Sequence, residues 1–269
     1  MNTNKFTLLN CLKIFVLLII STQTLMFGFG FIGELFKLND LVFLCFYIGE
    51  IITVFFTIIY LYKKFNLNLK SLLIPKKINP KELILMLLML FCSYIVINLL
   101  THTITSIAHI AKTLPDNNDE IGEVSDIAGM CFLICLTIIG PTIEEFFFRG
   151  IFLLKLKDNS NTIVALILSA FLFGILHPYG YAQQIRAFIT GLFFGIIALK
   201  TNNIFYTIIG HIIFNSLTMI FGIIRRYSNF VQLGNGCFHF NAIINITSIV
   251  IFSVTLFILY KVPLSEVKI

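Results

Sequence analysis

The sequence GPTIEEFFFR, residues 140–149, places two adjacent carboxylates and an arginine within a stretch that is otherwise apolar enough to span a membrane. A charged side chain at the centre of a transmembrane helix costs about 2.5–3.5 kcal/mol on insertion scales. Such groups usually face the interior of a helical bundle and act there, whereas a charged helix end at the membrane surface is the alternative for this motif taken alone. Fold and function therefore depend on the partners that these side chains find.

The composition around this stretch is that of a membrane protein. The 269 residues are 58% hydrophobic and only 12% charged, whereas soluble domains carry about 25% charged residues. We expect an all-α polytopic membrane protein, a single integral membrane domain over residues 1–269, with the active site inside the helical bundle. Apolar segments long enough for about eight transmembrane helices cover about 11–31, 41–62, 83–107, 127–148, 162–176, 187–199, 204–224 and 242–260.

The basic residues predict the orientation of these segments. With an inside N-terminus, thirteen lysines fall on the inner side and five lysines and arginines on the outer side, Arg149 being left aside. This bias predicts cytoplasmic N- and C-termini. It also accounts for the net charge of +6 without a nucleic-acid partner. The expected partners are the lipid bilayer and a peptide or protein substrate, and the Phe-, Ile-, Asn- and Lys-rich usage indicates a bacterial plasma membrane.

The two glutamates of the motif differ in their neighbours along the helix. Glu145 and Arg149 are four residues apart, so a salt bridge within one helix is predicted. Glu144 is rotated by about 100° from Glu145, and the same arginine does not obviously serve it. A carboxylate without a countercharge suits a general base, and Pro141 can open the helix beside it to water or substrate.

Two later segments carry further polar groups. His177 closes the apolar run that contains Gly174, a position expected to admit another backbone, although a histidine at a helix end is by itself more typical of an interface. His211 and Asn215 are four residues apart on one face of a later helix. Two polar groups so placed favour a common polar target, and an interhelical hydrogen bond is the equally weighted alternative.

The order EExxxR, FxxxH and HxxxN on three separate segments resembles the CPBP family, which comprises CAAX prenyl proteases of the Ras-converting type and their bacterial relatives, including bacteriocin-processing and immunity proteins. The resemblance covers about residues 127–219, which it identifies as the catalytic core. It implies an intramembrane endopeptidase in which Glu145 and Arg149 are a supporting pair that orders the site.

The resemblance also implies catalytic roles for four residues. Glu144 would activate the attacking water with assistance from His177. His211 and Asn215 would donate hydrogen bonds to the oxyanion of the tetrahedral intermediate. These implied roles agree with the residue types, because each mechanism of this kind needs a base, a proton partner and donors where negative charge develops.

The cofactor stays open at this point. If zinc is present, Glu144, His177 and His211 would be its ligands, as in His₂Glu metalloproteases. The HExxH signature of the zinc helix is absent, and a glutamate-dependent mechanism without a metal fits these residues equally well; we favour the latter.

Two functions of different classes follow. The first is hydrolysis of membrane-associated peptides, of a CAAX type or resembling bacteriocins and pheromones. The second is a non-catalytic membrane immunity or scaffold protein that binds such peptides. The complete set of three motifs favours the enzyme.

Overall fold

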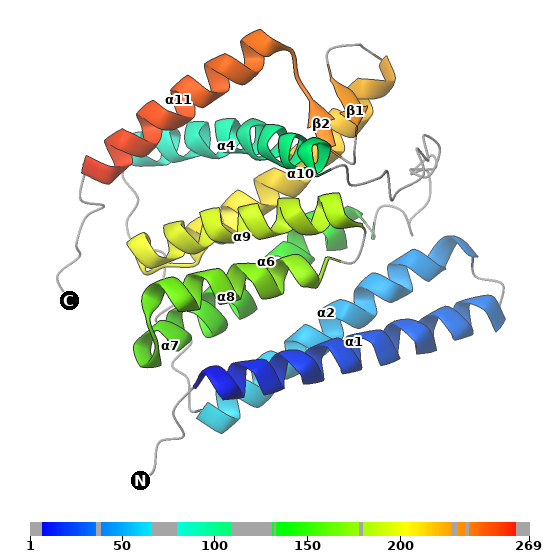
Figure 1. Ribbon diagram of the computed structural model, residues 1–269. Coiled ribbons are helices and arrows are strands. Elements are labelled where there is room, and N and C mark those ends of the chain that lie inside the picture. Colours follow the sequence, from blue (N-terminus) through cyan, green and yellow to red (C-terminus); the bar gives the residue numbers. More distant parts are fainter. Residues whose placement is uncertain are drawn as a thin grey trace.

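The computed structural model describes residues 7–35, 39–65, 80–108, 131, 133–177, 180–227, 231–234 and 237–261. These ranges form a bundle of helices with one short hairpin (Figure 1), so the predicted all-α class is confirmed. The long helices are α1 (Leu8–Leu35), α2 (Asn39–Phe65), α4 (Pro80–Ile107), α8 (Thr162–Ile175), α9 (Tyr181–Thr201), α10 (Phe205–Tyr227) and α11 (Ala242–Lys261).

Several of these helices are suited to a bilayer. Within the described residues, four are long and apolar enough to cross a membrane, over Leu9–Phe29, Ile84–Ile107, Tyr181–Thr201 and Phe205–Arg225. Two shorter apolar helices cover Thr162–Ile175 and Ala242–Ile258. Large apolar side chains such as Phe27, Phe56 and Ile243 are exposed on the outside of the bundle, where lipid would cover them. The total of eight spans stays a prediction.

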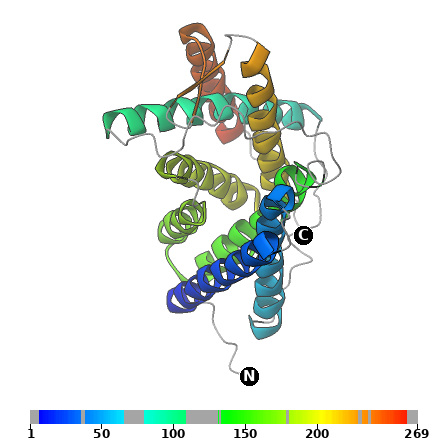
Figure 2. The ribbon, with the colours of Figure 1, turned by 90° about the vertical axis from the view of Figure 1, so that its right-hand side faces the viewer.

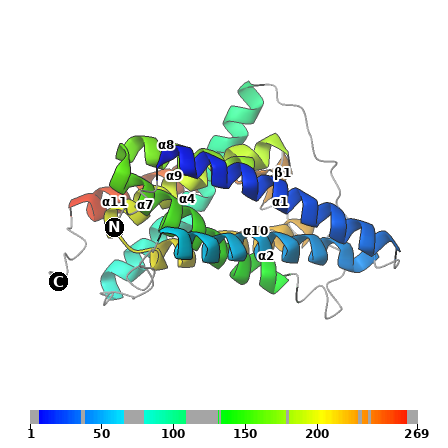
Figure 3. The same cartoon turned by 90° about the horizontal axis from the view of Figure 1, so that it is seen from below.

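Helices α1 and α2 pair along their length and form one side of the molecule. Figures 1 and 3 show them as two long neighbouring helices. Their shared interface includes buried Leu18 and Leu61, and this apolar cluster continues into residues of the central segment such as Phe148. Helix α2 thereby contacts the segment that carries the two glutamates.

Helices α8 and α9 pack closely in the middle of the bundle, and Figure 2 shows them side by side. Small residues permit this approach: a Cβ on Gly174 would come within 3.0 Å of the Gln184 carbonyl oxygen, and one on Gly191 within 3.0 Å of the Ala170 backbone. The predicted close backbone approach at Gly174 is confirmed. Helix α8 starts at a cap in which the Asn161 side chain accepts from the amides of Ile163 and Val164.

On the opposite side, α4 packs against α11, α9 and α10. The hairpin of β1 (Gln232–Gly234) and β2 (Cys237–His239), which the sequence did not predict, adds to this layer. It is tied down because the Phe238 amide donates to Asn98 Oδ1 on α4 at 3.2 Å.

The central helical segment is irregular. It runs through η1 (Cys135–Ile139), α6 (Gly140–Glu145), η2 (Phe146–Leu153), α7 (Leu154–Leu156) and η3 (Lys157–Asn159), where η1 and η2 are π-helical. The predicted end of this segment near residue 148 was wrong, because the buried run Ile151–Leu154 continues the helix. π-Helical turns are rare and occur often at functional sites.

The predicted start of the sixth segment near residue 187 was also wrong. Helix α9 begins at Tyr181, so Arg186 lies within it. The polar residues Gln183, Gln184 and Arg186 reduce the hydropathy of the first two turns, and a hydropathy reading therefore assigns those turns to a loop.

Candidate active site

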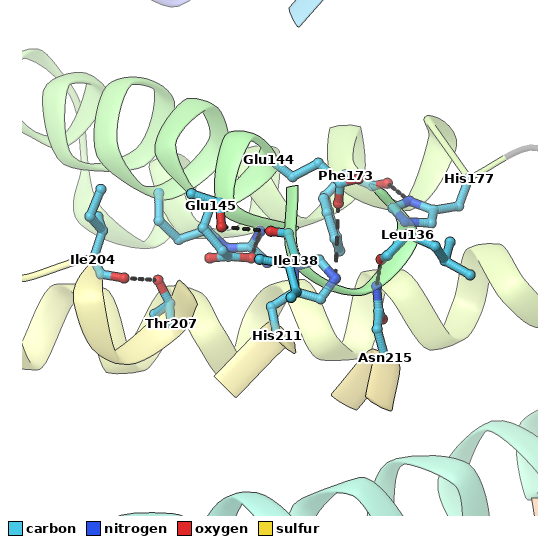
Figure 4. Close-up of polar contacts among 12 residues, drawn as sticks. Leu136, Ile138, Glu144, Glu145, Phe173, His177, Ile204, Thr207, His211 and Asn215 are labelled. Atoms are coloured by element: carbon cyan, nitrogen blue, oxygen red, sulfur yellow. Dashed lines mark hydrogen bonds and ion pairs between the residues drawn. The ribbon is translucent and has the colours of Figure 1, made fainter. Parts of the chain in front are cut away.

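The residues singled out from the sequence come from three parts of the bundle that meet in space. Glu144 and Glu145 end α6, and Arg149 follows in η2. His177 lies just beyond the end of α8, and α10 carries His211 one turn before Asn215. Figure 4 shows the two glutamates, the two histidines and Asn215 gathered between the central segment, α8 and α10. The position inside the bundle is the one that the sequence predicts.

The Glu145–Arg149 salt bridge is confirmed. Arg149 Nη1 donates to Glu145 Oε1 at 2.7 Å, and the two side chains are 1% and 0% exposed. The guanidinium carbon also lies 4.3 Å from the centre of the Phe173 ring, a cation–π contact with α8. A charge buried this completely needs a partner of opposite sign, and Glu145 supplies it.

His211 lies between the two glutamates. Its Nδ1 is 3.0 Å from Glu145 Oε1, the same oxygen that Arg149 contacts. Its Nε2 is 3.9 Å from Glu144 Oε2. Glu145 therefore contacts both Arg149 and His211, and it orients the histidine.

This arrangement constrains the protons of His211. A carboxylate only accepts hydrogen bonds, so Nδ1 carries a proton toward Glu145. Nε2 then donates a hydrogen bond only when the ring carries both protons, and otherwise accepts one.

Glu144 retains an acceptor that nothing else uses. Its side chain is 15% exposed, and its buried Oε2 has no hydrogen-bond partner among the described residues. The separation of 3.9 Å from His211 Nε2 is too long for a hydrogen bond. Oε2 is therefore available to accept a proton from a water molecule beside His211.

His177 approaches the site from α8. Its Nδ1 donates to the Phe173 carbonyl oxygen at 2.7 Å, and its ring packs against that of Phe173 with centroids 4.5 Å apart. This hydrogen bond fixes the ring and leaves Nε2 as the remaining polar atom. Within the described part of the chain, no ion pair joins His177 to Glu144.

Asn215 has a partner that the irregular helix provides. In η1, the Gly140 amide donates to Cys135, five residues earlier, and not to Leu136. Pro141, five residues after Leu136, has no N–H to donate. The Leu136 carbonyl oxygen instead accepts from Asn215 Nδ2 at 2.9 Å.

His211 and Asn215 therefore do not share a hydrogen-bond partner, but they line the same pocket. An amide nitrogen carries two protons, so Asn215 keeps a second donor after it binds Leu136. The pocket has an empty volume of about 410 Å³. His177, His211 and Asn215 line it together with residues of α4 and α9, including Tyr94, Asn98, Gln183, Arg186 and Thr190.

The proposed zinc set does not come together. Among the described residues, no three His, Cys, Asp or Glu side chains lie close enough to hold a metal ion. Glu144 and His211 approach each other, but His177 contacts the backbone of its own helix. The donor groups as arranged do not fit a His₂Glu zinc site.

A comparison with known protein families identifies the segment that holds these groups. Residues 126–217, about a third of the chain, match the family described as Type II CAAX prenyl endopeptidase Rce1-like. This segment is an Rce1-like domain. The predicted CPBP-type resemblance is thereby confirmed for it, and all six of the residues singled out from the sequence lie inside the match. Neither the curated proteins nor the solved structures gave a match to the chain.

The sequence did not indicate several other residues that surround the site of this Rce1-like domain. Tyr94 and Asn98 of α4 reach the pocket from outside the matched segment. The ring of Phe194, on α9, packs against the ring of His211, and the ring centres are 5.8 Å apart. Asn98 carried a usable signal, because a polar side chain within an apolar span usually has a partner. Nothing in the pattern indicated that Phe194 or Tyr94 would lie here.

Proposed function

We propose that the protein is an intramembrane endopeptidase that hydrolyses membrane-associated peptides or proteins through water activated by Glu144. The observation that carries the proposal is the position of His211, which is held by the buried Glu145–Arg149 pair and faces an otherwise unpartnered Glu144 oxygen. The match of this segment to a family of endopeptidases supports it.

The attack on the peptide bond would use Glu144 as the base. Glu144 Oε2 accepts a proton from water as the water oxygen bonds to the scissile carbonyl carbon, and the carbonyl electrons move onto the carbonyl oxygen. The free amide proton of Asn215 and a doubly protonated His211 then donate to that oxyanion. Donors held in place before the reaction are among the largest contributors to catalysis of acyl transfer.

Collapse of the intermediate requires a proton for the leaving amine. Protonated Glu144 can deliver the proton that it took from water, as a general base that later acts as a general acid. His177 lines the same pocket and is our proposed assistant in this transfer. Glu145 and Arg149 touch neither water nor substrate in this scheme, and they position His211.

We place the substrate and the chain in the membrane as follows. The substrate class is a short membrane-associated peptide, of a CAAX type or resembling a bacteriocin or pheromone. The membrane is a bacterial plasma membrane, with both termini in the cytoplasm as the distribution of basic residues favours. A binding protein without catalysis would not need an unpartnered carboxylate beside His211, and this favours hydrolysis over the immunity or scaffold alternative.

The test is cleavage by the purified protein in lipid, with candidate membrane peptides and mass spectrometry of the products. Glu144→Gln keeps the size of the side chain and removes the base, so we expect a loss of about 10²–10⁴-fold in kcat. His177→Ala and His211→Ala are also expected to abolish detectable cleavage while membrane insertion is kept.

Asp158→Asn is the matched control, because it makes the same kind of acid-to-amide change on an exposed residue of η3. It should retain full activity. Full activity in the Glu144→Gln protein would overturn the catalytic assignment. Unchanged cellular function in all motif variants would instead favour the binding protein.

A further inference from the structure

Arg186 is a positively charged residue of the pocket that has no role in the proposed mechanism. It lies in the second turn of α9, is only partly exposed, and lines the same pocket as His177, His211 and Asn215. Within the described residues, no carboxylate forms an ion pair with it. An arginine held within a membrane bundle without a countercharge is costly, and such residues are usually functional.

The rest of the pocket offers no anion to neutralise this charge. None of the described side chains that line it is an aspartate or glutamate. Tyr94 donates its hydroxyl proton to Thr218, which donates in turn to the Phe214 carbonyl. Asn98 donates to the Tyr94 carbonyl and accepts from the Phe238 amide. These polar groups of α4 and α10 therefore have hydrogen-bond partners other than Arg186.

Helix α9 places neutral polar groups next to the charge. Gln183 and Thr190 stand three residues before and four residues after Arg186, so the three side chains lie on one face of the helix. All three line the pocket. A planar guanidinium flanked by an amide and a hydroxyl is suited to a carboxylate, which it can bind through two parallel hydrogen bonds.

We propose that Arg186 binds the C-terminal carboxylate of the peptide substrate. The inference rests on the proposed function and assigns to Arg186, on α9, the recognition of the free C-terminus of the substrate. Arg186 lines the same pocket as His211 and Asn215, the two proposed oxyanion donors, and this shared position supports a chain end. A peptide that reaches both Arg186 and these donors has only a short stretch between its terminal carboxylate and the cleaved bond.

The test compares one peptide in two forms. The probes are a prenylated CAAX-type peptide and an unprenylated apolar peptide of the same length, each made as the free acid and as the C-terminal amide. The wild-type protein is expected to cleave the acids with a kcat/KM at least about 10-fold above the amides, because a hydrogen-bonded charge is lost in the amide. Arg186→Gln should remove this preference, and Arg186→Lys should keep part of it, since lysine retains the charge without the planar fork.

Arg225→Gln is the matched control, because Arg225 lies in α10 and is not among the residues that line the pocket. It should leave the preference intact. Equal cleavage of acid and amide by the wild type would overturn the proposal.

A binding measurement separates this inference from the proposed hydrolysis. The chain has no tryptophan, so the fluorescence of a single tryptophan placed in the peptide reports only on the peptide. Binding is measured with the Glu144→Gln protein in vesicles of zwitterionic lipid and again with anionic lipid. Tighter binding of the acid than of the amide supports the anchor even if no peptide is cleaved. Failure of the acid to bind more tightly than the amide overturns the anchor, even if the protein proves to be a protease.

Discussion

Two arginines from different helices near the candidate site have contrasting surroundings. Arg149 in the central segment is 1% exposed, bonded to Glu145 at 2.7 Å and covered by the ring of Phe173. Arg186 in α9 is partly exposed, lines the pocket and has no carboxylate partner among the described residues. Both belong to the Rce1-like segment.

The difference separates a structural cation from one available to a ligand. Arg149 is neutralised within its own helix, and its charge serves to hold Glu145 and, through it, His211. Arg186 has no such internal use among the described residues. A site that binds a charged peptide end and also builds an oxyanion-binding group needs both kinds of cation, and here they come from different helices.

The largest expected effect is on the free energy of unfolding, and it concerns Arg149. Arg149→Met leaves the Glu145 carboxylate buried with only His211 beside it, which is expected to lower the free energy of unfolding by about 3–5 kcal/mol. Arg186→Met removes no ion pair and should change it by less than about 0.5 kcal/mol. Unfolding in detergent, followed by circular dichroism, measures both.

The Glu145→Gln, Arg149→Met double variant tests whether the cost of losing Arg149 comes from the unpaired Glu145 carboxylate. Removing both charges should destabilise less than the sum of the two single changes, since the second change removes a group already left unpaired. Equal destabilisation by Arg149→Met and Arg186→Met would contradict the distinction between the two arginines.

A smaller effect is expected at Asn215, which donates to the Leu136 carbonyl and also lines the pocket. Asn215→Leu leaves the Leu136 carbonyl without its donor, at an expected cost of about 1–3 kcal/mol in the free energy of unfolding. Adding Pro141→Ala restores an N–H five residues after Leu136, the spacing that Gly140 already uses toward Cys135.

The double variant is expected to recover stability but not cleavage, because the oxyanion donor is still missing. Recovery of both would show that Asn215 serves only the helix, whereas recovery of neither would contradict the assignment of the Leu136 carbonyl. Thermal unfolding and the kcat of peptide cleavage are the two measurements.

The smallest expected effect concerns metal. Since the described residues do not gather a three-ligand site, a chelator such as EDTA or 1,10-phenanthroline should change the rate of cleavage by less than about 2-fold. A zinc ion bound by Glu144 and His211 would place a second cation near Arg149, so the comparison of Arg149 with Arg186 would have to include it. Loss of activity on chelation with rescue by zinc would therefore replace the metal-free mechanism.

Local rules in the sequence predicted much of the site. The spacing of four residues between Glu145 and Arg149 corresponds to neighbouring positions on any helix, so their salt bridge followed without knowledge of the fold. The same reasoning placed His211 and Asn215 on one face of α10. Hydropathy located the long apolar helices, but it failed at the start of α9, where a polar face turned toward the pocket resembles a loop.

Contacts between helices required the tertiary structure. The position of His211 between Glu144 and Glu145 depends on how α10 crosses α6, and no sequence pattern states that crossing. The same holds for the donation from Asn215 to Leu136, which requires a π-helical turn, a proline and a second helix together. Arg186 lines the pocket because α9 begins at Tyr181 and packs beside α4 and α10, which local sequence rules do not specify.

Hydropathy along each helix was enough to predict an all-α membrane protein, and the three motifs resembled the family that residues 126–217 match. Only the tertiary structure decided which carboxylate is engaged and which is free, and which arginine is paired within the chain. The physical reason is that a buried charge is stabilised by whatever packs within a few ångströms of it, and in a bundle most of those groups come from other helices.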